Sequence, residues 1–352
     1  MKEGQSAQNS ATEARKTRRA ASSRRPTMID VANEARVSQT TVSLVLNHAD
    51  GARLSAETRK RVVQAAERLG YRQAPRGLSP ARTASAVGFL CDELSTDPWT
   101  AIALDAVREK AWERGLTVMV MATRGDADME AAALAQLATQ PLVGLIYATI
   151  NTRLIDPPAS ALPLVLLNCH VANGSLPSVV PGEVAGGHAA TDYLIAAGHR
   201  RIGYINGEAS MEAARHRLRG YKQALATADL PIDPDLVRDG NWQPLSGYEA
   251  TRALMRLSSP PSAIFCANDL MALGCYEALR ELDLRIPDEV AVMGYDDREI
   301  AQHLHPPLST VLLPHYEMAA IAAEWLFDLA DGAEMRPRQI KVECPIVKRG
   351  SA

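Results

Sequence analysis

One stretch of the sequence decides the fold of the N-terminal region: Pro26-Thr-Met-Ile-Asp-Val-Ala-Asn-Glu-Ala-Arg-Val-Ser-Gln-Thr-Thr-Val-Ser-Leu-Val-Leu-Asn47. Thr27 can cap a first helix, and Asp30 follows it at the spacing of a capping box. The next apolar residues recur at helical spacing and give that helix one buried face: Val31, Ala32 and Ala35. Arg36-Val37 interrupts the pattern and predicts a turn before a second helix.

The second helix is predicted to begin after Ser38, which can cap it. Its core-facing residues are Val42, Val45 and Leu46. Small polar side chains stay outside near its N-terminus: Gln39, Thr40, Thr41 and Ser43. Such side chains suit a helix whose N-terminal end approaches the base edges and phosphates of DNA.

A third helix is capped by Ser55 and ends at Gly70. Its apolar positions are Val62, Val63, Ala66 and Leu69. The three helices predict an all-α helix-turn-helix DNA-binding headpiece over residues 26–73. The structural alternative is a three-helix bundle that binds no ligand.

Charge is divided unevenly along the chain. Residues 1–82 hold 16 Lys or Arg against 7 Asp or Glu, a net charge of +9, and the other 270 residues hold 22 against 34, a net charge of −12. A basic head on an acidic body is typical of a protein that meets a phosphate backbone. The tail at residues 1–25 is rich in Ser, Ala and Gln, so we expect it to be disordered. It either contacts phosphate loosely or is an inert, solvated leader.

Composition excludes several classes of protein. The chain has 352 residues, enough for two or three domains, and 47% of them are hydrophobic. It has no apolar run of about 18 residues and no apolar segment after its basic N-terminus, so neither a membrane span nor a secretory signal is expected. The five cysteines lack metal-type spacing and are interpreted as buried thiols of a reducing cytoplasm: Cys91, Cys169, Cys266, Cys275 and Cys344.

From residue 86 onward, short apolar runs alternate with amphipathic segments. The predicted strands are 86–90, 117–121, 143–147, 164–167, 201–205, 263–267 and 290–294. The predicted helices are 100–114, 127–139, 184–198, 211–228, 246–257 and 269–283. This alternation indicates parallel sheets covered by helices. A joining stretch at 177–182 divides the strands, so the body is predicted as an α/β core of two doubly wound parallel-sheet lobes.

Ligands of doubly wound sheets lie beyond the carboxyl ends of the strands. This rule and the neighbouring loops select eight candidate ligand-binding residues: Asp92, Trp99, Tyr147, Asn168, Arg217, Trp242, Asn268 and Asp296. Aromatic faces beside amide, carboxylate and guanidinium groups suit a polyhydroxylated ligand. Each candidate has a structural alternative. Asn268 or, preferably, Asp269 can cap the next helix, Trp242 can be a lone exposed aromatic, Arg217 can belong to a solvated face, and Asp297 can be a turn residue.

With these residues assembled, the chain resembles the lactose/galactose repressor family of bacterial transcription regulators over about residues 26–349. In the N-terminal region the resemblance rests on Asp30-Val-Ala, Val37-Ser, Thr41-Val-Ser, Leu46-Asn47, Ser55-Ala-Glu-Thr-Arg59 and Leu69-Gly-Tyr71. In the body it rests on Gly198-His-Arg-Arg-Ile-Gly203, Arg217-Leu-Arg-Gly-Tyr221, Ala267-Asn-Asp269, Met293-Gly-Tyr-Asp-Asp297, Pro307-Leu-Ser-Thr310 and Val347-Lys-Arg349.

The resemblance implies a headpiece at 26–73, a hinge at 74–84 and, at 85–352, a two-lobed core like that of periplasmic sugar-binding proteins. It also implies homodimers on palindromic double-stranded operator DNA. In the core it implies that Arg217, Asn268 and Asp296 hold an effector between aromatic walls at Trp99 and Trp242. On the DNA side it implies contacts from Ser38, Gln39, Thr40, Ser43 and Asn47, with Thr27 on phosphate.

Two places depart from the family pattern. Leu44 stands where members often carry an arginine, so a bidentate guanine contact is absent and the operator preference should differ. The family hinge is a short helix with a leucine wedge for the minor groove, but here it contains Pro75, Gly77 and Pro80, which are poor helix formers. Leu78 is nearest to the wedge but out of register, so a looser linker is expected.

These observations favour a sequence-specific transcriptional regulator, a repressor, whose operator affinity is controlled by a sugar or related metabolite and which acts at the nucleoid in the cytoplasm. A transport binding protein fits the body, but the headpiece and the lack of a signal oppose it. An enzyme is disfavoured because the chain has no phosphate loop, dinucleotide fingerprint or nucleophile elbow, and no cofactor or metal is expected. The sequence separates neither sugar from purine effectors nor inducer from co-repressor. With no heptad segment after Arg349, a tetramer is not expected.

Overall fold

The computed structural model describes residues 28–37, 41–42, 45, 56–69, 84–94, 98–333 and 339–352. The chain separates into two compact units, Met1–Arg76 and Gly77–Ala352. Several predictions fall outside the described residues: the tail at 1–25, nearly all of the hinge, the caps Ser38 and Ser55, the departure at Leu44, and the DNA contacts assigned to Thr27, Ser38, Gln39, Thr40, Ser43, Asn47 and Leu78.

The first unit contains the helices α2 (Met28–Ala35) and α4 (Ala56–Leu69), and residues 41, 42 and 45 between them are also helical. Val31, Val42 and Val62 are completely buried in a common core, as the apolar spacing predicted. Arg36 adopts a φ of +51°, which ends α2 at the predicted turn. The prediction that Val63 faces the core was wrong, since its side chain is 40% exposed. Val63 is one residue beyond the buried Val62, and the rotation of the helix between the two residues turns Val63 away from the core.

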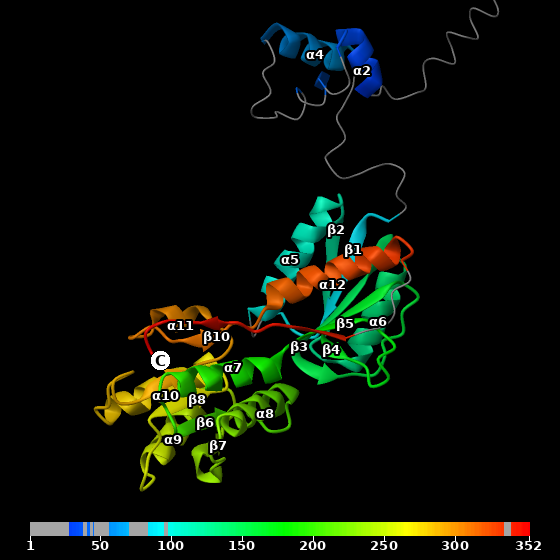
Figure 1. Ribbon diagram of the computed structural model, residues 1–352. Helices are drawn as coiled ribbons and strands as arrows, with labels where there is room; N and C mark the ends of the chain where they lie inside the picture. Colours follow the sequence, from blue (N-terminus) through cyan, green and yellow to red (C-terminus); the bar gives the residue numbers. More distant parts are fainter. Residues whose placement is uncertain are drawn as a thin grey trace, which may run out of the picture. The chain divides into compact units, whose positions relative to one another are not determined.

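The second unit has two lobes, each built on a parallel sheet (Figure 1). The first sheet has six strands in the order β11-β5-β4-β3-β1-β2. Their bounds are β1 (Ala86–Cys91), β2 (Thr117–Ala122), β3 (Leu142–Leu154), β4 (Leu164–His170), β5 (Ser178–Pro181) and β11 (Gln339–Val342). The helices of this lobe are α5 (Trp99–Glu113), α6 (Ala127–Ala138) and α12 (His315–Ala330).

The second lobe has a four-stranded sheet in the order β7-β6-β8-β9. Its strands are β6 (Ile202–Asn206), β7 (Val237–Asp239), β8 (Ala263–Cys266) and β9 (Ala291–Met293). Its helices are α7 (Glu183–Ala196), α8 (Glu212–Thr227), η1 (Pro234–Leu236), α9 (Pro244–Met255), α10 (Asp269–Glu281) and α11 (Glu299–His303). A short antiparallel pair, β10 (Thr310–Val311) and β12 (Ile346–Val347), completes this lobe.

The chain passes between the lobes at three places: from β5 into α7, from β10 to α12, and from β11 to β12. Figure 1 shows the consequence for α12, which comes late in the sequence but lies with the first lobe, and β11 likewise belongs to the first sheet. Each lobe buries its own apolar core around its sheet. In each lobe a ligand is expected beyond the carboxyl ends of the parallel strands.

The seven predicted strands and six predicted helices all occur within a few residues of their expected bounds, except that β3 extends to Leu154. The stretch predicted to join the lobes, 177–182, does lead from the first lobe into the second, but it is not an irregular linker, because residues 178–181 form β5. This strand is fully buried between β4 and β11. Because both of its faces are buried, its sequence does not alternate between apolar and polar residues, which is the usual sign of a strand. All five cysteines are buried and free, as predicted. Among the described residues, no helix has the length and apolarity of a bilayer span.

Candidate ligand-binding site

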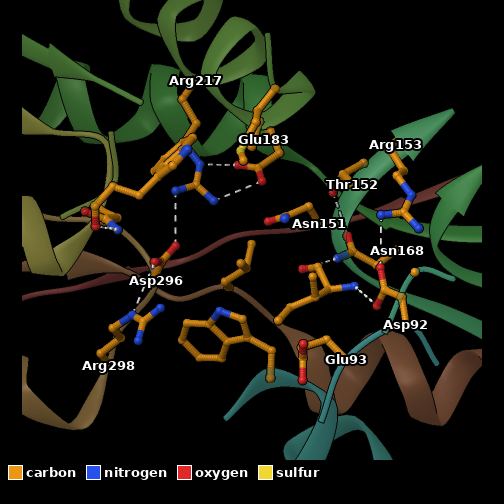
Figure 2. A pocket seen from close by; sticks show the side chains of 18 of the residues that line it. Asp92, Glu93, Asn151, Thr152, Arg153, Asn168, Glu183, Arg217, Asp296 and Arg298 are labelled. Carbon is orange, nitrogen blue, oxygen red and sulfur yellow. Dashed lines mark hydrogen bonds and ion pairs between the residues drawn. The ribbon is translucent and has the colours of Figure 1, made fainter. Parts of the chain in front are cut away.

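A cavity of about 480 Å³ lies between the two lobes (Figure 2). Seven of the eight candidate residues line it: Asp92, Trp99, Asn168, Arg217, Trp242, Asn268 and Asp296. Glu93, which follows the first predicted strand beside Asp92, also lines it, and so do residues that the sequence analysis did not select, among them Arg124, Asn151, Thr152, Arg153, Glu183 and Arg298. The rule that ligands lie beyond strand ends therefore located the cavity correctly, although it found only part of the lining.

Arg217 is the most deeply buried cation of the cavity, with 3% of its surface exposed. Its Nε and Nη2 donate to the two carboxylate oxygens of Glu183 at 2.6 and 3.0 Å. Its Nη1 donates to the carbonyl of Ala267 at 2.5 Å and to Asp296 Oδ1 at 3.1 Å. Burial by itself lowers the pKa of Arg217, because it disfavours the charged guanidinium. The carboxylates of Glu183 and Asp296 have the larger combined effect and hold this pKa well above its usual value. The solvated-face alternative for Arg217 is thereby excluded.

Close packing of α7 against α8 makes this ion pair possible. A Cβ added to Gly187 of α7 would lie 2.5 Å from the carbonyl oxygen of Arg217, and one added to Gly220 of α8 would lie 2.3 Å from the carbonyl oxygen of Val184. The two glycines therefore let the helix backbones touch. As a result Glu183, at the start of α7, meets Arg217 in the second turn of α8.

Asp296 connects Arg217 to a second arginine of the cavity. It adopts a φ of +107°, a backbone conformation that residues other than glycine rarely take. Its Oδ2 lies 3.7 Å from Nε of Arg298. The Arg298 guanidinium lies 5.0 Å from the ring centroid of Trp99, which belongs to the other lobe. Asp296 and Arg298 lie side by side in Figure 2, and the carboxylate thus places one arginine against an aromatic side chain across the cavity.

Asn168 holds the wall of the first lobe in place. It follows the core of β4 with a φ of +59°, and its Nδ2 donates to the carbonyls of Thr149 and Ile150 at 2.9 and 3.0 Å. Its Oδ1 accepts a hydrogen bond from Thr152 at 2.5 Å. These bonds fasten the irregular part of β3, where the register with β4 shifts, and aim residues 150–153 at the cavity.

Asp92 directly follows β1 and joins the same wall. Its Oδ1 accepts from the backbone N–H of Ile150 at 2.9 Å, and its Oδ2 lies 3.0 Å from Arg153 Nη1. Burial raises the pKa of the Asp92 carboxyl, although both of these contacts act in the opposite direction. Asp92 therefore positions part of the lining and at the same time faces the cavity (Figure 2).

Trp242 is not a lone exposed aromatic. Its backbone has a φ of +66°, and a Cβ at Gly207 would lie 2.0 Å from its ring, so the indole rests directly on that glycine. Asn268 donates from Nδ2 to the carbonyl of Trp242 at 3.1 Å. Among the described residues, Nε1 of Trp242 is buried with no hydrogen-bond partner. The indole therefore brings both an apolar face and a donor to the site.

Two further expectations need correction. Tyr147 lies outside the cavity: its hydroxyl donates to Glu130 at 2.7 Å, and its ring packs in the core between β3 and α6, because β3 continues for seven residues beyond it. The cap of α10 is Asn268, which accepts from the N–H of Met271 at 2.8 Å, and not Asp269. Asp269 is buried and accepts from Thr310 and from the N–H of Arg298, while burial and Asp296 raise its pKa to about 8.

The charges of the cavity are balanced. Its lining includes four arginines and four carboxylates: Arg124, Arg153, Arg217 and Arg298 with Asp92, Glu93, Glu183 and Asp296. Three of the arginines have an acidic partner within the lining itself. The fourth, Arg124, is exposed. The buried part of the cavity thus offers many hydrogen-bonding groups but no excess of either charge.

Of the predicted DNA-contacting residues, the structure describes Thr41 alone. It is half-buried at the start of the helical residues between α2 and α4. The geometry of the headpiece core agrees with a helix-turn-helix arrangement, since the predicted apolar faces of the first two helices meet the third.

A helical headpiece followed by a two-lobed domain with a polar cavity defines a class of protein, namely regulators that link a small ligand to DNA. Comparisons with known proteins agree. The pattern of bacterial regulatory proteins of the lacI family matches residues 27–73, and that of a periplasmic binding protein-like domain matches residues 191–352.

Individual relatives match over most of their length. The chain is 32% identical to the ribose operon repressor of Haemophilus influenzae, over 92% of this chain and 98% of that protein. It is 30% identical to the HTH-type transcriptional repressor CytR of Escherichia coli, over 92% and 96%. A solved transcriptional regulator, CelR in complex with cellobiose, has a TM-score of 0.65 at 31% identity and covers 93% of this chain and 100% of its own. The chain belongs to the lacI family of bacterial regulatory proteins, and it is a DNA-binding transcriptional regulator.

Proposed function

We propose that this chain is a transcriptional repressor whose affinity for a palindromic operator is set by a neutral, polyhydroxylated small molecule, a sugar or close relative of one, bound between the lobes. The domains that carry this function are the headpiece at 26–73, the hinge at 74–84 and the core at 85–352. The protein acts as a homodimer on chromosomal DNA in the cytoplasm. The relatives named as repressors support this proposal, and none of them is named as an enzyme.

The observation that carries the choice of ligand is the charge balance of the cavity. Arg217, Arg298 and Arg153 are each paired with a carboxylate, so a phosphate or carboxylate ligand would have to displace an existing partner. Hydroxyl groups can instead use the free lone pairs of the carboxylates and the remaining N–H groups of the arginines. Trp99 and Trp242 can cover the C–H faces of a sugar ring, which is apolar enough to stack on an indole.

Ligand control of DNA affinity follows from the position of the cavity. A ligand that contacts Asp92 and Asn168 in one lobe and Arg217 and Asp296 in the other stabilises one arrangement of the lobes. The coupling is reciprocal, because operator DNA must change ligand affinity by the same factor that the ligand changes operator affinity.

The test is operator binding measured by fluorescence anisotropy, using DNA from upstream of the protein's own gene. The panel contains neutral mono- and disaccharides, nucleosides, sugar phosphates and sugar acids. We expect one neutral compound to change operator affinity by about 5–150-fold. Release by the ligand identifies an inducer, and tighter binding identifies a co-repressor.

Two results would contradict parts of the proposal. A response to charged compounds alone would refute the neutral ligand. Lack of specific DNA binding with and without every compound would refute operator control as a whole. The matched variant Trp242→Ala should keep basal operator binding and lose the response to the ligand, because it changes the cavity and leaves the headpiece intact.

A further inference from the structure

A second cavity, of about 570 Å³, lies beside two of the crossings between the lobes. Its walls come from the end of β5 and the start of α7, from one side of α8, and from β11. The only residue that it shares with the first cavity is Glu183. The buried pair of Glu183 and Arg217 therefore stands between the two cavities.

The charge of this second cavity differs from that of the first. Arg219 and Lys341 line it and are exposed, and neither has a hydrogen bond or ion pair within the described part of the chain. His188 and His216 add two imidazoles. The acidic residues in the lining are Glu183, whose two oxygens are occupied by Arg217, and the exposed Glu343. The cavity consequently has cationic groups that no carboxylate within hydrogen-bonding distance neutralises.

These cationic groups line one cavity from two lobes. Arg219 belongs to α8 of the second lobe and Lys341 to β11 of the first. His216 of α8 also lines the cavity, and burial lowers the pKa of its imidazole against the opposing effect of Glu212. The rest of the wall is largely apolar, with Pro181, Val184 and Val342. Such a mixture suits a ligand that has an organic body as well as a negatively charged group.

We propose that the second cavity is a binding site for a small organic dianion, separate from the site of the neutral effector. Arg219 and Lys341 bind its charged group, and the apolar wall receives its carbon skeleton. Lys341 lies on β11 of the first lobe and Arg219 on α8 of the second, so a ligand held by both bridges the lobes. Binding of the dianion therefore stabilises one arrangement of the two lobes, as binding of the neutral effector does. The two ligands lie on opposite sides of the Glu183–Arg217 pair.

Isothermal titration calorimetry on the full-length protein tests the site, with ionic strength held constant by chloride. The probes are inorganic phosphate, glycerol 3-phosphate and succinate. We expect saturable binding of at least one probe, with one molecule per chain. A preference for glycerol 3-phosphate identifies a phosphate monoester as the natural class, and a preference for succinate identifies a dicarboxylate.

Paired variants locate the binding. Arg219→Gln with Lys341→Gln removes both cations that hold the anion and should weaken binding by about tenfold or more. Lys222→Gln with Arg256→Gln is the matched control, because both side chains are exposed, neither lines the cavity, and the change in net charge is the same. The control should bind the probe as the unmodified protein does.

The result is independent of the effector proposal. Trp242→Ala alters the first cavity only, so it should abolish the response to the neutral effector and leave affinity for the dianion unchanged. Three outcomes would overturn the second site: no saturable binding of any probe, equal weakening in the control pair, or loss of dianion binding in Trp242→Ala.

Discussion

Replacing Glu183 by Gln should destabilise the ligand-binding unit strongly. The side chains of Glu183 and Arg217 are 2% and 4% exposed, so solvent does not screen their interaction. The variant leaves the buried guanidinium with the Ala267 carbonyl and one carboxylate, Asp296, which is shared with Arg298. Breaking a buried, hydrogen-bonded ion pair by removal of one charge costs about 3–5 kcal/mol, because the remaining charge is left uncompensated. For a unit of this size we expect the melting temperature to fall by roughly 6–20 °C.

Tryptophan fluorescence measures this change in the full-length protein, because all four tryptophans, at 99, 112, 242 and 325, lie in the second unit. Glu324→Gln is the matched control. It removes the same charge from an ion pair with Lys110 whose side chains are 57% and 27% exposed, and exposed pairs contribute about 0–1 kcal/mol. A melting temperature for Glu183→Gln equal to that of the control would refute the claim that this buried pair stabilises the unit.

Three further predictions concern the lining and its surroundings. Gly207→Ala should displace the indole of Trp242 and abolish ligand-induced fluorescence change, since the added Cβ would lie 2.0 Å from the ring; an unaltered response would contradict this. Asn168→Gly keeps the left-handed backbone but removes three hydrogen bonds, so ligand affinity should fall about tenfold and unfolding free energy by about 1–3 kcal/mol, measured by calorimetry and urea titration. Burial, together with Arg217 and Arg298, lowers the pKa of His315 to about 3. Between about pH 6.5 and pH 3, His315 is therefore protonated in the unfolded chain and neutral in the folded chain. Stability should fall across that window by at most about 1.4 kcal/mol per pH unit, and His315→Phe should flatten the urea midpoint against pH.

The sequence was a good guide wherever one local pattern decides the structure. Helical spacing identified the buried face of α2, since Val31, Ala32 and Ala35 are all in the headpiece core. Strand ends identified most of the ligand cavity, because parallel strands of one sheet deliver their carboxyl ends to one edge. These features depend on residues that are neighbours along the chain or on a rule shared by all doubly wound sheets.

Local patterns failed where a distant segment supplies the partner. The stretch of β5 reads as a linker because the strand that covers its outer edge, β11, lies more than 150 residues later in the chain. Glu183 was overlooked because its importance comes from Arg217, which reaches it only when Gly187 and Gly220 bring two helices into contact. Tyr147 was assigned to the cavity because the end of β3 was placed too early. No local signal marks these three arrangements.

By itself, the sequence determined the class of this protein: a basic helix-turn-helix headpiece on an acidic body of two parallel-sheet lobes, with polar and aromatic residues at the strand ends. Spacing and charge along the chain are sufficient for those conclusions. Only the tertiary structure decided which charges are neutralised. Arg217 and Arg219 are two residues apart on α8, yet one is buried against two carboxylates and the other is exposed beside a second cavity. The helix turns them to different faces, and the packing of α7 against α8 brings Glu183 to Arg217 alone.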